Sequence, residues 1–235
     1  MKNLLFILLI SSLTNGLVAQ NPTDIRKAMT GGQKVKVKPE YNFAGSLKFE
    51  TTSTNKGKSY KGEQTWYFPK NNESIFGINM NMGQGKNMRA VIDYTDNTMI
   101  MFMEEQKVVM GMSVDIEKSM KDIQKDPKKK TSTPRKTGRT KTILGYSCDE
   151  WVTENADYST SVWMSEKVPI ASANFYKVMA QQLAKSTGTP MPTDMKGVPL
   201  EVQTTNKATN DKYSMVCKEV SNKPIKFSTS GYKTM

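Results

Sequence analysis

The sequence predicts a mainly β fold of the α+β class, in which one curved antiparallel sheet, or incomplete β-barrel, is covered by helices. From residue 41 onward, short runs with apolar side chains at every second position alternate with polar turns. This period of two is typical of strands with one buried face. Several of the turns are short enough to close hairpins, which favours a meander over alternating strand–helix units.

The first 20 residues of the 235-residue chain have the layout of a secretory signal peptide. Lys2 supplies a positive start, an apolar run extends from Leu4 to Ile10, and a weaker apolar stretch ends at Ala19. The apolar run is shorter than the roughly 20 residues that span a bilayer. We therefore expect cleavage near Ala19 or Gln20 and a periplasmic or secreted protein without a transmembrane segment in the mature chain. A buried N-terminal helix is the alternative.

Residues 21–40 are expected to form a short helix followed by a linker. The helix covers 23–30, where Thr23 or Asp24 can cap its first turn and two glycines follow its last residue. The remaining chain, 41–235, is expected to form a single β-domain. Its expected strands are 41–52, 62–69, 74–82, 88–94, 98–103, 107–112, 141–146, 148–153, 158–165, 198–205 and 212–220.

Two later segments change to helical spacing. Residues 114–124 and 172–186 each place apolar side chains on one face, as expected for short amphipathic helices that cover the concave side of the sheet. Residues 125–141 are basic and of low complexity, with eight Lys or Arg and one acid. Two prolines in this stretch exclude a continuous helix, so the sequence predicts a loop.

The basic loop has two interpretations. Its cations could contact an anionic envelope surface, with Lys128, Lys129, Lys130 and Arg135 as the candidate contacts. The alternative is a solvated loop without a partner. Nucleic acid is not expected as a partner, because no aromatic side chains are interleaved for base stacking.

Methionine is unusually frequent, with 17 in the chain, and many lie at alternate positions of expected strands. Residues two apart share a face of a sheet, so these side chains form a pliable, sulfur-rich surface. The sequence predicts an apolar ligand cavity here, whereas an ordinary core and a copper(I) site are the alternatives. The candidate cavity residues are Met80, Met82, Met99, Met101, Met103, Met110 and Met112 on strands, with Phe175 and Met179 on the second helix.

The composition restricts the chemistry of the protein. The chain contains no histidine, which excludes His-based triads, His general bases and His metal ligands. It also has no G-x-S-x-G, no phosphate-binding glycine loop and no metal-ligand spacing. We therefore expect no enzyme activity, no cofactor and no metal. The two cysteines, Cys148 and Cys217, are candidates for a disulfide in an oxidising compartment, and two separate buried thiols are the alternative.

Two short blocks carry a resemblance to a known family. Gly145, Tyr146, Cys148 and Trp151 are followed after a turn by a Val-Trp-Met-Ser strand at 162–165, and a Gly-Val-Pro turn lies further along the chain. Over about residues 41–220 the chain resembles an exported bacterial domain family of unknown function, which is related to the lipoprotein-carrier (LolA/LolB-like) fold. The resemblance implies a curved, incomplete antiparallel barrel whose open side is covered by helices, with an apolar cavity for acyl chains.

These observations predict a non-enzymatic exported binding protein that holds an apolar small molecule, such as a lipid acyl chain, in a methionine-rich cavity. Two alternatives remain open from the sequence. One is an envelope protein-interaction module with a closed core, and the other is a copper(I)-handling protein.

Overall fold

A computed structural model describes residues 35–55, 57–69, 74–81, 87–113, 133–154, 156–170 and 195–234. The signal peptide and the helices expected at 23–30, 114–124 and 172–186 lie outside these ranges. The described residues contain strands and turns but no helix. None of them therefore forms a helix with the length and hydropathy that a membrane span requires.

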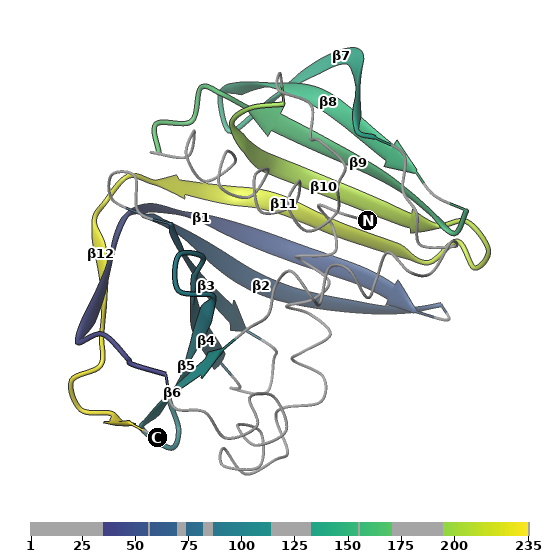
Figure 1. Ribbon diagram of the computed structural model, residues 1–235. Coiled ribbons are helices and arrows are strands. Elements are labelled where there is room, and N and C mark those ends of the chain that lie inside the picture. Colours follow the sequence, from purple (N-terminus) through teal and green to yellow (C-terminus); the bar gives the residue numbers. More distant parts are fainter. Residues whose placement is uncertain are drawn as a thin grey trace.

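The described residues form one sheet, in which every segment expected as a strand, except 141–146, coincides with one of the first eleven strands (Figure 1). The strands are β1 (Glu40–Asn55), β2 (Lys58–Pro69), β3 (Ile75–Asn81), β4 (Asn87–Asp93), β5 (Thr98–Met103), β6 (Val108–Ser113), β7 (Arg135–Ile143), β8 (Tyr146–Glu154), β9 (Tyr158–Ser165), β10 (Val198–Asn206), β11 (Lys212–Ser221), β12 (Ile225–Ser228) and β13 (Lys233–Thr234).

The spatial order of the strands is β13-β6-β5-β4-β3-β2-β1-β11-β10-β9-β8-β7, and β12 pairs with the start of β1. All pairs are antiparallel except the short contact between β13 and β6. Figure 1 shows β1, β2 and β8–β11 as one curved surface from which β3–β6 turn away. The mainly β class and the curved antiparallel sheet expected from the sequence are therefore confirmed.

The long strand β1 changes partner at Gly45. Before this residue β1 pairs with β12, and after it β1 pairs with β11, with a bulge against β2 between Phe43 and Gly45. A Cβ atom at Gly45 would lie 2.4 Å from the carbonyl oxygen of Ser221. Only glycine permits the two backbones to approach so closely, which is what allows β1 to cross between its two partners.

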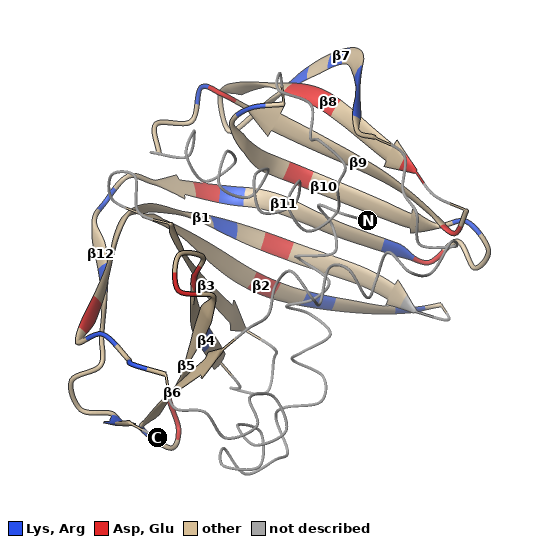
Figure 2. Cartoon of the chain, viewed as in Figure 1, with Lys and Arg blue, Asp and Glu red and all other residues tan. Residues whose placement is uncertain are grey.

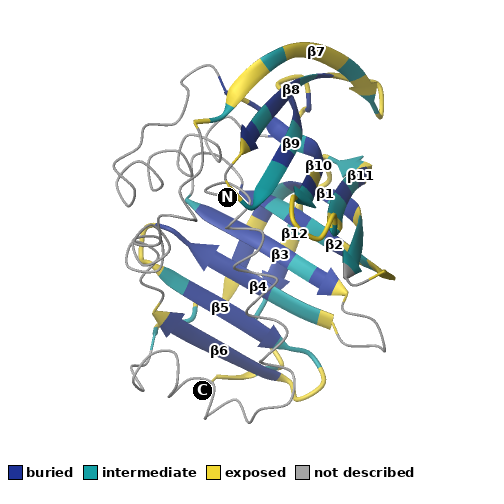
Figure 3. Ribbon diagram, turned by 90° about the vertical axis from the view of Figure 1, so that its right-hand side faces the viewer, coloured by how far each residue is buried: buried dark blue, intermediate teal, exposed yellow. Residues whose placement is uncertain are grey.

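The two faces of the sheet carry different cores. We call the side that bears Leu47, Phe49 and Trp66 the inner face, because these side chains belong to the largest buried cluster. On the opposite, outer face of β3–β6 a second cluster lies beneath β12, the segment 35–37 and Tyr232. Strands β3–β6 are thus buried on both faces (Figure 3). This explains why residues 99–102 are apolar at every position rather than at alternate ones.

One expectation about the basic stretch was wrong. Residues 135–141 form most of strand β7 instead of a loop. The strand pairs with β8 and contains a bulge between Lys136 and Thr140, where Gly138 has a φ of 84°. The segment 141–146 is likewise not one strand, because Leu144 and Gly145 form the hairpin turn between β7 and β8, both with positive φ.

Candidate functional site

The methionines of β3–β6 lie on the inner face in register. Residues directly opposite one another in an antiparallel pair share a face, so each set of cross-strand partners forms a row. Two rows are deeply buried, and we call them the deep rows; they are Phe76–Ile92–Met99–Met112 and Ile78–Ala90–Met101–Met110. A third, which we call the outer row, is Met80–Met88–Met103–Val108.

Burial changes from row to row. Met110 and Met112 are 0% exposed and Met101 is 4% exposed, so no water-sized space touches the first two. In the outer row Met88 and Met103 are only half-buried. The outer row is therefore the least enclosed of the three rows. The structure brings the expected strand residues Met80, Met99, Met101, Met103, Met110 and Met112 onto one face, whereas Met82, Phe175 and Met179 lie outside the described residues.

Two side chains of β2 extend these rows. Trp66 is opposite Ile78 and so continues a deep row, and Gln64 is opposite Met80 and continues the outer row. The Gln64 amide Nε2 donates to the sulfur of Met215 on β11. Burial raises the pKa of Tyr213 to about 12, against the opposing effect of its hydrogen bond with Gln64. The phenol of Tyr213 is therefore neutral at physiological pH, and this part of the inner face is uncharged.

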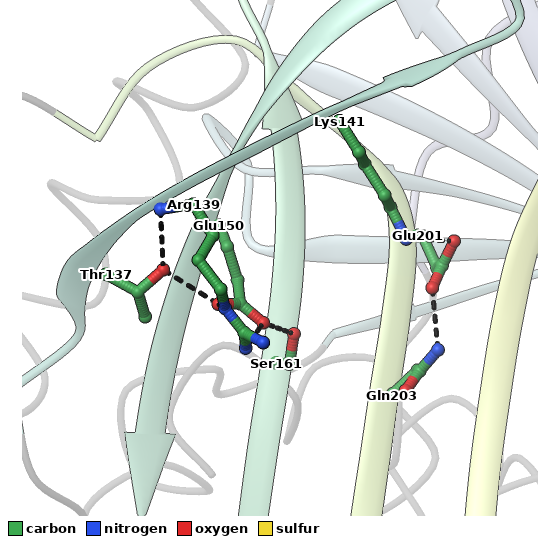
Figure 4. Close-up of polar contacts among 7 residues, drawn as sticks. All are labelled: Thr137, Arg139, Lys141, Glu150, Ser161, Glu201 and Gln203. Carbon is green, nitrogen blue, oxygen red and sulfur yellow. Dashed lines mark hydrogen bonds and ion pairs between the residues drawn. The ribbon is translucent and has the colours of Figure 1, made fainter.

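A polar cluster lies on strands β7–β9 (Figure 4). The Glu150 carboxylate, 2% exposed, accepts hydrogen bonds from Thr137 Oγ1 at 2.7 Å, Arg139 Nε at 2.6 Å and Ser161 Oγ at 2.8 Å. Burial raises the pKa of Glu150, but these hydrogen bonds and the charge of Arg139 outweigh it and leave the pKa below its usual value. A carboxylate held in its ionised form is unsuited to act as a general acid near neutral pH.

A second ion pair lies beside this cluster. Lys141 Nζ is 2.7 Å from the Glu201 carboxylate and 4.2 Å from the centre of the Trp163 ring. Glu150, Trp163 and Glu201 are direct cross-strand partners and so share a face. Trp163 also belongs to the large buried cluster that contains the methionines of the deep rows. The polar cluster and the methionine rows nevertheless lie on different strands, β7–β10 and β3–β6.

The described part of the basic stretch is largely neutralised by acids of the sheet. Lys136 pairs with Asp149 at 2.9 Å, and Arg139 and Lys141 pair with Glu150 and Glu201. Figure 2 shows these charges on β7, β8 and β10. Of the expected anionic contacts, Arg135 is exposed on β7. Lys128, Lys129 and Lys130 lie outside the described residues.

Cys148 and Cys217 are both buried and both free. They lie on β8 and β11, with β9 and β10 between them, so three strand spacings of about 4.8 Å separate them along the sheet. A disulfide needs Cα atoms within about 7 Å. The alternative of two separate buried thiols is the one that the structure contains, and the expected disulfide is not present. Burial raises the pKa of Cys148 and raises that of Cys217 to about 11.

One further pocket was not predicted from the sequence. A pocket of about 460 Å³ lies beside β1, β3 and the turn after β4, where Lys38 Nζ is 2.8 Å from Asp93 Oδ2. The hydrogen bond that Lys38 donates to Asp93 raises the pKa of Lys38. These two residues are far apart in the sequence, which gave no signal of their pairing. Among the described residues, no group of three Cys, Asp or Glu side chains is placed to hold a metal ion.

Several solved structures are distantly similar to this chain. PNGF-II has 13% identity and a TM-score of 0.40; the match covers 82% of this chain but only 31% of PNGF-II, so this chain spans about a third of that protein. A chain of the Pseudomonas aeruginosa MucA/MucB complex has 8% identity and a TM-score of 0.38, covering 78% of this chain and 52% of that one. A LolA superfamily protein from Nitrosomonas europaea has 5% identity and a TM-score of 0.32, covering 85% and 90%. Similarity at this level carries no information on function.

Sequence comparison is more decisive about the family. No curated protein matches the chain. The family model described as "Domain of unknown function (DUF4412)" matches residues 43–229, which include every strand from β2 to β12. The family of unknown function expected from the sequence is thereby confirmed, and the chain belongs to the DUF4412 family.

Proposed function

We propose that this protein is a non-enzymatic, exported binding protein that holds an apolar ligand, such as a lipid acyl chain, against the methionine rows of its inner face. The observation that carries the proposal is the gradient of burial across these rows. Met110 and Met112 are fully buried, whereas Met88 and Met103 are only half-buried on the same face. A pliable apolar surface that is partly open is suited to receive a chain that buries there.

The physical driving force is the removal of apolar surface from water. Burial of one methylene contributes about 0.8 kcal/mol, so a dodecyl chain gains about 10 kcal/mol before the cost of association. Methionine has three rotatable bonds and can adjust to chains of different length and branching. The proposed specificity is therefore for chain length and apolarity rather than for one particular compound.

Native mass spectrometry of the protein purified from its own compartment tests the proposal. We expect a co-purifying lipid, and we expect the delipidated protein to bind 1-lauroylglycerol in a calorimetric titration. Met103→Lys places a charge in the outer row and is expected to weaken this binding at least tenfold, because burying the ammonium group costs several kcal/mol. Met103→Leu keeps an apolar side chain of similar volume and should bind normally.

Asn81→Lys provides the matched control for added charge. Asn81 is exposed and lies next to Met80 along β3, so its side chain points to the opposite face. This variant should bind as the wild type does. A protein that carries no lipid and binds no amphiphile, but captures a protein partner, would contradict the proposal and favour the interaction module with a closed core.

A further inference from the structure

Trp66 carries a buried hydrogen-bond donor without an acceptor. The side chain is 5% exposed. Among the buried side-chain nitrogen and oxygen atoms of the described residues, the indole Nε1 of Trp66 is the one without a hydrogen-bond partner. A buried donor that makes no hydrogen bond costs about 1–3 kcal/mol relative to a satisfied one. Buried polar groups in folded proteins are nearly always paired, so an unpaired one requires an explanation.

The surroundings of Trp66 explain why the protein itself supplies no acceptor. The rings of Phe49 and Phe76 lie 4.9 and 5.5 Å from the indole, measured between centroids. The cross-strand partners of Trp66 are Leu47 and Ile78, which are equally apolar. Gln64 is the nearest polar residue along the same face of β2, and its amide is already engaged with Met215 and Tyr213.

Trp66 also adjoins the methionine rows. Its deep row continues through Ile78 and Ala90 to Met101, and Ala90 is the smallest side chain of that row. The outer row, through which we propose that the ligand enters, is the next row along the same strands. A chain inserted from the outer row toward Ala90 would bring its polar end to the level of Gln64 and Trp66.

We infer, on the basis of the proposed function, that Trp66 donates a hydrogen bond to the carbonyl oxygen of an ester-linked acyl chain. A neutral carbonyl suits this position better than a carboxylate. Phe49, Phe76, Ile78 and Gln64 carry no positive charge, and a buried carboxylate with one donor would remain unpaired. The ligand class is therefore an acyl ester rather than a free fatty acid or a hydrocarbon.

Two amphiphiles that differ in one group test the inference. 1-Lauroylglycerol has an ester carbonyl, and 1-O-dodecylglycerol has a methylene in its place. We expect the delipidated wild type to bind the ester about fivefold more tightly, which is the value of one net hydrogen bond. Trp66→Phe should bring this ratio close to one. Trp151→Phe is the matched control, because Trp151 lies on β8 in a separate buried cluster, and this variant should keep the wild-type ratio.

A spectroscopic measurement on the wild type avoids any effect of substitution on folding. The chain has three tryptophans and so gives three indole N–H signals in a proton–nitrogen NMR spectrum. We expect the signal that is missing in Trp66→Phe to move downfield when the ester is added, but not when the ether is added.

The outcomes separate the two proposals. Equal binding of ester and ether, together with an unchanged Trp66 signal, would overturn this inference and leave the proposed function standing. If the wild type binds neither amphiphile, the proposed function itself fails.

Discussion

Replacement of Gly197 by alanine should be among the most damaging single substitutions in this protein. Gly197 precedes β10 with a φ of 89°, and a Cβ atom there would lie 2.1 Å from the carbonyl oxygen and 2.4 Å from the carbonyl carbon of Ser165. These atoms are backbone, so they cannot move aside without shifting the end of β9. Ser165 is 1% exposed and pairs with Val198, and its hydroxyl accepts from the backbone N–H of Lys167.

The magnitude follows from two contributions. The left-handed conformation alone costs a residue with a side chain about 1–2 kcal/mol. Displacement of the Ser165 backbone by roughly an ångström would also weaken two or more buried hydrogen bonds, each at about 1–3 kcal/mol. We therefore expect Gly197→Ala to lower the free energy of unfolding by about 4 kcal/mol or more, which is rare for a single substitution.

Gly145→Ala isolates the conformational contribution. Gly145 has a φ of 81° in the β7–β8 turn, and nothing lies within 4 Å of the Cβ atom that alanine would add. This variant should lose only about 1–2 kcal/mol. Urea unfolding followed by tryptophan fluorescence measures both variants. If they are destabilised to within 1 kcal/mol of each other, the close approach to Ser165 does not constrain the fold and the reasoning is wrong.

Three further predictions rest on buried groups of the sheet. Glu150→Gln should cost about 1–3 kcal/mol at pH 7, and because the folded pKa of Glu150 is lowered, urea titrations should show this difference shrinking as the pH falls below 4.5; a difference independent of pH would contradict the assignment. Cys217, with a pKa of about 11, should react with iodoacetamide at pH 8 about 100-fold more slowly than an exposed cysteine of pKa 9. Mass spectrometry should find Cys148 and Cys217 unmodified in the native protein under conditions that fully alkylate a denatured control. Met110→Ala should cost about 2–5 kcal/mol in chemical unfolding and Met103→Ala clearly less, since only the first side chain is fully enclosed; equal losses would argue against a partly open outer row.

The strand pattern could be predicted because alternation of apolar side chains directly reflects burial of one face. The same signal fails for β7, which is mostly polar and in which Arg139 and Lys141 form ion pairs with Glu150 and Glu201 on other strands. Strand β12 was missed because it is only four residues long and directly follows Pro224. Short elements of this kind are specified by their partner, here the start of β1, rather than by their own composition.

The candidate site could likewise be predicted only in part. The alternate spacing of methionines placed them on one face, as the register confirms for Met99 and Met101 opposite Met112 and Met110. Their unequal burial could not be predicted, because it depends on how far each row lies from the rim of the sheet. The orphaned N–H of Trp66 is likewise invisible in the sequence, since the absence of an acceptor is a property of all its neighbours at once.

The position of β1 at the centre of the sheet has a consequence for the order of events during synthesis. One edge of β1 can pair early with β2, the next strand to be synthesised. The other edge can pair only after β11 and β12 have been synthesised. Until residues 212–228 have left the ribosome, a nascent chain exposes the vacant edge of its longest strand. Pairing over so long a sequence separation is intrinsically slow. Residues 212–228 thus determine when the sheet can be completed.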